Sequence, residues 1–176
     1  PNTGLVTMLD ARSGEVLAVA ETGPDSYAEG QLLLDPGRGL LYAVNLTDYT
    51  CSVLDAGSLE SVALIEGVER LALDAENDLL YLAGNGALRL AGAASRETRR
   101  EVRVGEWSRF LLSDLDAPGN RLYLAYNDGG RYVLGIYDTP SLAEVASLTL
   151  PGRPDDLAAD GQRGRVYLTL DDGRQS

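Results

Sequence analysis

The sequence predicts an all-β protein that is built from a repeating group of four short strands. Two offset motifs recur along its 176 residues, and the segments between them are short apolar runs that contain many β-branched and aromatic residues. No window has the apolar spacing of an amphipathic helix of three turns. With 44% hydrophobic and 24% charged residues the chain has the composition of a folded globular domain, so we expect one antiparallel β domain.

The first motif places an Asp seven residues before a Tyr, with a turn-rich stretch between them. It occurs at 34–42, 73–81, 115–123 and 159–167. The four tyrosines are Tyr42, Tyr81, Tyr123 and Tyr167, and the four aspartates are Asp35, Asp74, Asp116 and Asp160. Because a periodic residue belongs first to the scaffold, we predict that the Tyr rings pack between sheets and that the Asp side chains cap turns.

The second motif is an Asp followed three residues later by a Ser. It occurs at 10–13, 55–58 and 138–141, and a degenerate copy with Gly92 in place of Asp ends at Ser95. Asp and Ser side chains bond to nearby backbone groups, so this motif predicts a tight hairpin turn. One period then contains four strands, for example 31–34, 40–45, 50–54 and 61–65. Four-stranded antiparallel sheets that recur every 40 to 45 residues or so are typical of β-propeller blades.

The phase of the motifs places an incomplete group of strands at each end of the chain. We expect a half-blade at 1–23, blades at about 28–67, 68–105 and 108–152, and a half-blade at 155–176. The two half-blades could pair with each other in a four-bladed ring, or missing repeats or a second copy of the chain could complete the ring. An open ring would leave apolar blade faces in water, which costs stability. The first residue, Pro1, also fits a processed chain or a part of a longer one.

The pattern resembles the YVTN-type bacterial β-propeller repeats, which share their architecture with NHL and WD-repeat propellers. In that family an inner strand leads through an Asp-Pro-x-Gly-like turn to a Leu-Tyr-Val strand, and a further strand ends in Asp before a Ser/Thr-containing turn. The matching stretches are 34–44 with 53–58, 73–83, 115–126 with 136–141, and 159–169. The pattern departs from the family at Gly92 and at 159–161. The resemblance implies a larger propeller of about seven blades, of which this chain is a part.

Composition excludes several kinds of chemistry. All 15 basic residues are Arg, and with neither His nor Lys the chain offers no His-based triad, no Lys Schiff base, no P-loop Lys and no His-ligated metal site. A formal net charge of -12 disfavours nucleic acid and anionic membranes as partners. The single cysteine, Cys51, cannot form an internal disulfide, and we predict that it is a buried apolar side chain. No apolar run reaches the roughly 18 residues of a membrane span.

Residues outside the repeat pattern, in the loops that enter the first strand of each blade, are the candidate ligand-binding residues. Such loops in propellers often surround the mouth of the central channel. The candidates are Tyr27, Glu29, Glu69, Arg70, Trp107, Arg109, Asp155 and Asp156. Trp and Arg are frequent binding anchors, and converging carboxylates could hold Ca²⁺, although no Asp-x-Asp-x-Asp-Gly loop is present.

These observations predict a non-catalytic binding or structural propeller module for a protein or ligand, with no catalytic residue and no resident cofactor. The alternative, which the YVTN resemblance allows, is a hydrolase of the propeller-lactonase kind with a carboxylate-bound metal in the central channel. The expected setting is bacterial and extracytoplasmic: periplasm, cell surface or secreted, without direct membrane insertion. A fold of this kind specifies architecture and leaves activity open, because function depends on particular sites.

Overall fold

The computed structural model describes residues 3–24, 30–105 and 108–171, and every regular element within them is a β-strand. The 16 strands form five antiparallel sheets, and no helix long and apolar enough to cross a membrane occurs in these ranges. The chain divides into two compact units, Pro1–Glu69 and Arg70–Ser176, which we call the first and the second unit. We describe each unit by itself.

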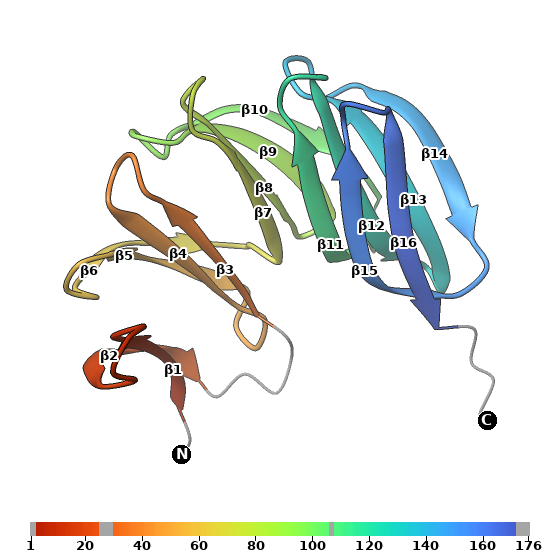
Figure 1. The fold of residues 1–176 in the computed structure, drawn as a ribbon. Coiled ribbons are helices and arrows are strands. Elements are labelled where there is room, and N and C mark those ends of the chain that lie inside the picture. The colour runs from red at the N-terminus through yellow and green to blue at the C-terminus, as the bar shows by residue number, and fades with distance from the viewer. Residues whose placement is uncertain (1–2, 25–29, 106–107, 172–176) are drawn as a thin grey trace. The chain divides into compact units, whose positions relative to one another are not determined.

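The first unit holds a two-stranded and a four-stranded sheet (Figure 1). The two-stranded sheet consists of β1 (Thr3–Leu9) and β2 (Val16–Pro24). The four-stranded sheet has the order β3 (Gln31–Asp35), β4 (Leu40–Asn45), β5 (Thr50–Asp55) and β6 (Ser61–Glu66). Each strand pairs with the strand that follows it in sequence, as expected where hairpin turns make the connections.

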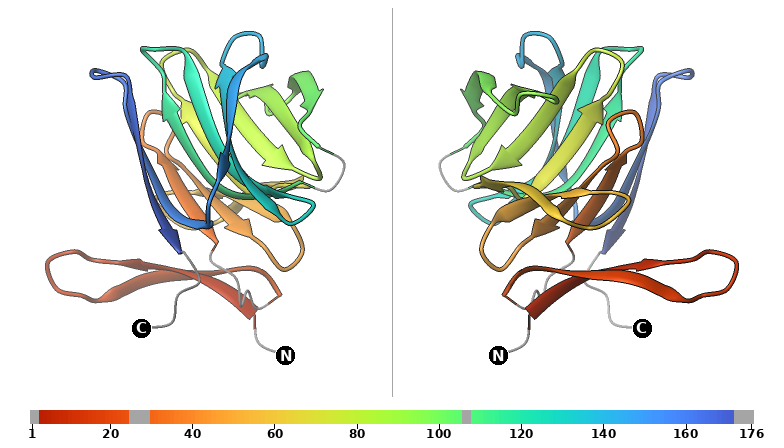
Figure 2. Two further views of the ribbon diagram at one scale, coloured as in Figure 1. Left: turned by 90° about the vertical axis from the view of Figure 1, so that its right-hand side faces the viewer. Right: turned by 90° about the vertical axis from the view of Figure 1, so that its left-hand side faces the viewer.

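The second unit holds two four-stranded sheets and one two-stranded sheet. The first sheet consists of β7 (Arg70–Asp74), β8 (Leu79–Gly84), β9 (Ala87–Gly92) and β10 (Thr98–Arg103), and the second of β11 (Arg109–Asp116), β12 (Arg121–Asp128), β13 (Arg131–Asp138) and β14 (Glu144–Leu150). The two-stranded sheet consists of β15 (Arg153–Asp160) and β16 (Arg165–Asp171), and Figure 2 shows both two-stranded sheets from the side. The predicted fold class is therefore confirmed: an all-β chain with four-stranded antiparallel sheets and two strands at each end.

The three four-stranded sheets share one register between their second and third strands. The repeat tyrosines lie opposite residues two positions before the second motif: Tyr42 opposite Val53, Tyr81 opposite Leu90, and Tyr123 opposite Ile136. The first residue of each second strand lies opposite the motif position itself: Leu40 opposite Asp55, Leu79 opposite Gly92, and Arg121 opposite Asp138. A one-residue slip would turn every side chain to the other face, so a shared register means shared inner and outer faces.

The repeat aspartates cap turns, as the sequence predicted. In each copy the carboxylate Oδ1 accepts a hydrogen bond from the backbone N–H three residues later: Arg38 to Asp35 at 3.1 Å, Asn77 to Asp74 at 3.1 Å, Gly119 to Asp116 at 3.0 Å, and Arg163 to Asp160 at 3.1 Å. The turn thus takes its shape from a local side chain, which explains how a short motif specifies it.

Replacing Asp74 by alanine is expected to lower the free energy of unfolding by about 1 to 3 kcal/mol, because it removes both acceptors of Asn77. Asp74 is buried, and its Oδ2 also accepts from Asn77 Nδ2 at 2.8 Å. Urea unfolding followed by circular dichroism measures the change. Glu76→Ala, an exposed substitution in the same turn, is the control and should change stability by less than about 0.5 kcal/mol. Equal effects of the two substitutions would contradict the capping role.

The second motif forms a different turn, in which Asp and Ser cooperate. Asp10 Oδ1 accepts from Ser13 N at 2.7 Å, and Asp55 Oδ1 accepts from Ser58 N at 2.9 Å. The bonds from the backbone N–H groups of Ser13 and Gly57, respectively, are the main cause of the lowered pKa values of Asp10 and Asp55. The residue after each Ser has a positive φ, which is 73° at Gly14 but 61° at Leu59. The turn therefore forms even where no glycine relieves the strain.

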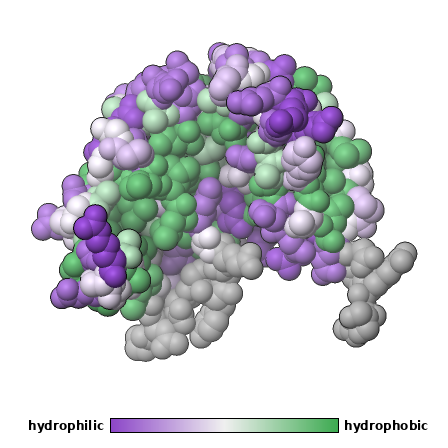
Figure 3. All heavy atoms as spheres, viewed as in Figure 1, coloured by the Kyte–Doolittle hydropathy of each residue, from purple (hydrophilic) through white to green (hydrophobic). Residues whose placement is uncertain are grey.

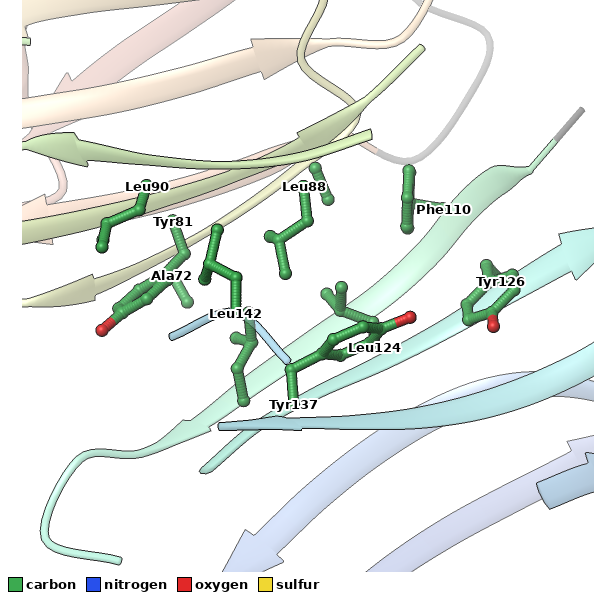
Figure 4. Close-up of a cluster of buried hydrophobic side chains, with 11 residues drawn as sticks. Ala72, Tyr81, Leu88, Leu90, Phe110, Leu124, Tyr126, Tyr137 and Leu142 are labelled. Atoms are coloured by element: carbon green, nitrogen blue, oxygen red, sulfur yellow. The ribbon is translucent and has the colours of Figure 1, made fainter. Parts of the chain in front are cut away.

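Apolar side chains between neighbouring sheets form the core of each unit. In the second unit Tyr81 and Leu88 of one sheet meet Phe110, Leu124 and Tyr137 of the next (Figure 4). The Phe110 and Tyr126 rings lie 5.8 Å apart in a tilted arrangement. In the first unit Val6 of the two-stranded sheet packs with Ala43 and Leu54 of the four-stranded sheet. Face-to-face packing of sheets within each unit thus buries the apolar strand faces.

Candidate functional site

The structure describes five of the eight candidate ligand-binding residues. Tyr27, Glu29 and Trp107 lie outside the described residues. Glu69 belongs to the first unit and is buried, whereas Arg70, Arg109, Asp155 and Asp156 belong to the second unit. The sequence placed all of them in loops, but the structure puts the last four inside or at the start of strands β7, β11 and β15. The first strands are longer at their N-terminal ends than the motif suggested, because sheet pairing extends beyond the repeat. The role of the eight candidate residues in ligand binding stays a prediction.

Three of these residues, Arg70, Asp155 and Asp156, make contacts that are local or join neighbouring sheets. The Arg70 Nε–H donates to the backbone carbonyl of Leu111, which ties β7 to β11. Asp156 accepts from the backbone N–H of its own neighbour Leu157 at 2.8 Å. Asp155 lies 4.0 Å from Arg153 in an exposed pair of little energetic value. Among the described residues no group of three or more His, Cys, Asp or Glu side chains is arranged to hold a metal ion.

Polar side chains inside the first strands link the three sheets of the second unit, and the sequence analysis missed them. Ser113 Oγ donates to the backbone carbonyl of Leu71 at 3.0 Å, and Asp114 Oδ2 accepts from the backbone N–H of Ala159 at 2.6 Å. The signal was present in the sequence, because Ser and Asp interrupt the apolar run at 111–115. These bonds pair half-buried polar groups across the sheet-to-sheet contacts.

The prediction that every repeat Tyr packs between sheets is right for Tyr81 and Tyr123 and wrong for Tyr167, and Tyr42 is buried. Tyr42, Tyr81 and Tyr123 are 0%, 1% and 6% exposed, but Tyr167 is 53% exposed. Tyr167 lies on β16, in a two-stranded sheet, and its neighbours along the strand alternate between half-buried and exposed. Val166, Leu168 and Leu170 face the cluster shared with β11–β14, so Tyr167 points to the opposite face of the sheet.

The first unit also exposes apolar side chains on regular strand faces. Leu5 and Leu9 of β1 are 57% and 55% exposed, while the alternate residues Val6 and Met8 pack on the four-stranded sheet. Leu32 and Leu34 of β3 are 62% and 55% exposed. Figure 3 shows apolar residues, in green, reaching the surface over β3–β6. Contiguous exposed apolar residues on a folded protein mark surfaces for interaction.

Cys51 is buried within β5, in agreement with the sequence prediction. Burial raises the pKa of its thiol to about 12, against 9.0 for an ordinary cysteine. The thiolate is the reactive form, and it is absent near neutral pH. Cys51 is therefore a packing residue.

We expect the folded chain to react with a thiol reagent such as dithionitrobenzoate at pH 8 at least about a hundredfold more slowly than the urea-unfolded chain, since both exposure and thiolate are lacking. The variant Cys51→Ala with Ser147→Cys, which carries its thiol at an exposed position on β14, is the control and should react rapidly when folded. Fast labelling of the native wild-type chain would contradict the buried position.

Comparisons with known proteins find likeness in structure only. No protein-family model matches the sequence, and no curated protein matches it. Among solved structures, BamB from Moraxella catarrhalis has a TM-score of 0.65 and 21% identity, with 85% of this chain and 45% of that chain covered. Sqt1 from Saccharomyces cerevisiae has a TM-score of 0.74 and 14% identity, with coverage of 96% and 50%. The dihydro-heme d1 dehydrogenase NirN, solved in complex with DHE, has a TM-score of 0.68 and 20% identity, with coverage of 95% and 37%.

These neighbours are β-propeller proteins, and identities this low establish the fold alone. The chain spans half or less of the length of each of the three. Its four-stranded sheets are β-propeller blades, and its two-stranded sheets correspond to half-blades.

Proposed function

We propose that this chain is a non-catalytic β-propeller module that binds a protein partner through its two half-blades. One observation carries the proposal: each half-blade has a strand edge that no described strand pairs with and exposes large apolar side chains, Leu5 and Leu9 on β1 and Tyr167 on β16. Both strands of each two-stranded sheet have such an edge, and the proposal concerns those of β1 and β16. An open edge invites an extended segment of another chain, because unpaired backbone N–H and C=O groups line it.

The chemistry of the half-blade β15–β16 supports a partner that is a β-strand. Backbone hydrogen bonds would supply affinity, and alternate side chains would supply selectivity. Tyr167 is suited to be the anchor, since it offers a large apolar ring with a polar end at an exposed position. The partner strand would therefore carry apolar residues at alternate positions. A net charge of -12 disfavours a nucleic acid at the same surface.

The sequence resemblance supports a narrower form of the same proposal: a YVTN-type, bacterial, extracytoplasmic propeller whose ring includes more blades than this chain carries. The coverage of about half of BamB and Sqt1 is compatible with a partial propeller. Propeller-lactonase-like hydrolysis with channel-bound Ca²⁺ is the competing function. Calorimetric titration with CaCl₂ separates the two, because tight stoichiometric binding would favour the hydrolase.

The proposal is tested with a fluorescent peptide that copies residues 131–138, the third strand of a complete blade. Fluorescence anisotropy should show saturable binding to the 176-residue chain. Tyr167→Asp should weaken this binding at least tenfold, because it replaces an exposed apolar ring on β16 with a charge. Tyr49→Asp, at an exposed tyrosine outside the half-blades, is the matched control and should leave binding unchanged. Absence of binding by a chain that is monomeric in light scattering, or equal weakening by both substitutions, would remove the proposal.

A further inference from the structure

We infer that the partner strand of β16 is β1 of a second copy of this chain, so that half-blades from two copies make one four-stranded blade. The inference rests on the proposed function and names the partner at the same surface. It follows from four features of the described strands: the strand type of each half-blade, the register, the faces, and the exposed side chains.

The two half-blades are complementary in strand type. β1 ends at an Asp-Ser turn in which Asp10 accepts from Ser13 N, as Asp55 after β5 accepts from Ser58 N. β1 and β2 are thus a third and a fourth strand. β15 and β16 join through the other turn, in which Asp160 accepts from Arg163 N, so they are a first and a second strand. Together the two half-blades contain the four strands of one complete blade.

The register of the complete blades predicts how β16 and β1 pair. In each complete blade the first residue of the second strand lies opposite the second-motif position, which places Arg165 opposite Asp10 and Tyr167 opposite Met8. The equivalent pair in the second complete blade of the second unit, Arg121 and Asp138, forms an ion pair at 3.3 Å. Arg165 and Asp10 carry the same charges at the same two positions, so the predicted register joins opposite charges.

The faces of the two half-blades agree with this register. Val166 and Leu168 pack toward β11–β14, and the register places Leu9 and Thr7 beside them. Met8 packs toward β3–β6, and the register places Tyr167 beside it. The composite sheet would therefore present one face to a blade of each copy, as β11–β14 presents its two faces to β7–β10 and to β15–β16.

The exposed side chains are those that such a composite blade would cover. Tyr123 is buried in one cluster with Leu157, and Ala159 packs against that cluster. Leu32 and Leu34 hold the same places before Asp35 as Leu157 and Ala159 hold before Asp160. They are 62% and 55% exposed, and Tyr167, the counterpart of Tyr123, is 53% exposed. Exchange of half-blades would bring Tyr167 of one copy onto Leu32 and Leu34 of the other.

Two copies have about the length of two of the solved propeller chains that this chain resembles. The chain spans 45% of BamB and 50% of Sqt1, and 37% of the longer NirN chain. The edges of β16 and β1 are unlike surfaces, so each contact runs head to tail, and a dimer with two such contacts pairs both edges of both copies. A second copy of the chain therefore provides a strand, β1, that fits the open edge of β16.

Cross-linking tests the register. Two variants are made on a Cys51→Ala background, one with Thr7→Cys and one with Leu168→Cys, which the register places opposite each other. Mixed under mild oxidation, the two variants should form a disulfide-linked heterodimer, since directly opposite Cβ atoms lie about 4.5 to 5.5 Å apart. Thr7→Cys mixed with Thr169→Cys is the matched control. It should give at least tenfold less product, because residue 169 lies one position out of register and on the other face.

Light scattering after size-exclusion chromatography tests the assembly. The expected mass is about twice the 18.8 kDa of one chain. Tyr167→Asp should raise the dissociation constant at least tenfold, and Tyr49→Asp should leave it unchanged. A monomer in which the double variant Thr7→Cys/Leu168→Cys closes its own disulfide would overturn the inference, and so would a dimer that lacks the in-register cross-link. A monomer that binds the 131–138 peptide would also overturn it while leaving the proposed function in place.

Discussion

Replacing Leu122 by alanine is expected to lower the free energy of unfolding of the second unit by about 2 to 5 kcal/mol. Leu122 on β12 is 0% exposed and lies in the cluster between two blades, with Tyr81 and Leu88 on the facing blade. The loss includes the transfer of the missing methyl groups and the cavity that remains. Hydrogen bonds between its own strands hold each blade in shape, so the facing blade cannot move in to fill the cavity. We therefore expect a loss in the upper part of the range of about 2 to 5 kcal/mol.

Urea unfolding followed by circular dichroism measures the effect as a shift of the transition midpoint. Leu148→Ala on β14 is the matched control, because it removes the same atoms from a strand of the same blade where the side chain is 60% exposed. Its effect should stay below about 0.5 kcal/mol. If the two substitutions shift the midpoint equally, blade-to-blade packing is not the main source of stability.

The strands and turns could be predicted from sequence because the motif residues act locally. Asp35 and Asp74 bond to a backbone group three residues away, and Asp10 does the same at the other turn. Such contacts need no information about distant parts of the chain. The apolar runs between the turns then have only one regular structure that fits their length.

The sheet-to-sheet contacts could not be predicted, because they depend on which residues 40 or so positions apart come together. The Ser113 hydroxyl donates to the carbonyl of Leu71, and the Arg70 Nε–H donates to that of Leu111. Both bonds form only when the two blades pack against each other. The exposure of Tyr167 was missed for a related reason. Tyr167 and Tyr123 hold the same place in the first motif, seven residues after an Asp, and the difference lies in whether a further sheet covers the ring.

The candidate ligand-binding residues show a further limit of prediction from the sequence: the ends of strands. Asp155 and Asp156 look like loop carboxylates next to Pro154, yet β15 includes all three. The extension comes from pairing with β16, which continues to Asp171. Where a strand begins depends on which residues pair with it in the folded sheet. The sequence does not show this pairing, so residues 153–156 were predicted to be a loop and are in fact the start of β15.

Raising the pH above about 10 is expected to destabilise the second unit steeply. Burial is the main cause that raises the pKa values of Tyr81, Tyr123, Tyr126 and Tyr137. In the unfolded chain a tyrosine ionises near pH 10, while each of these four ionises at a higher pH in the folded chain. The unfolded state therefore binds fewer protons above pH 10. Stability is fully present below that pH and falls above it, by up to about 1.4 kcal/mol per pH unit for each tyrosine.

The variant Tyr137→Phe isolates one of these four contributions. The Tyr137 hydroxyl donates to Glu144 Oε2 at 3.4 Å, so its removal should cost about 0.5 to 1.5 kcal/mol at pH 8. A phenylalanine cannot ionise, so the variant should lose stability less steeply above pH 10 and approach the wild type there. Urea midpoints measured from pH 8 to pH 11 give both slopes. Tyr49→Phe, at an exposed position, is the control and should follow the wild-type slope. Parallel curves for Tyr137→Phe and the wild type would mean that water reaches the Tyr137 hydroxyl, and the blade contact around it would then have to be looser than the structure has it.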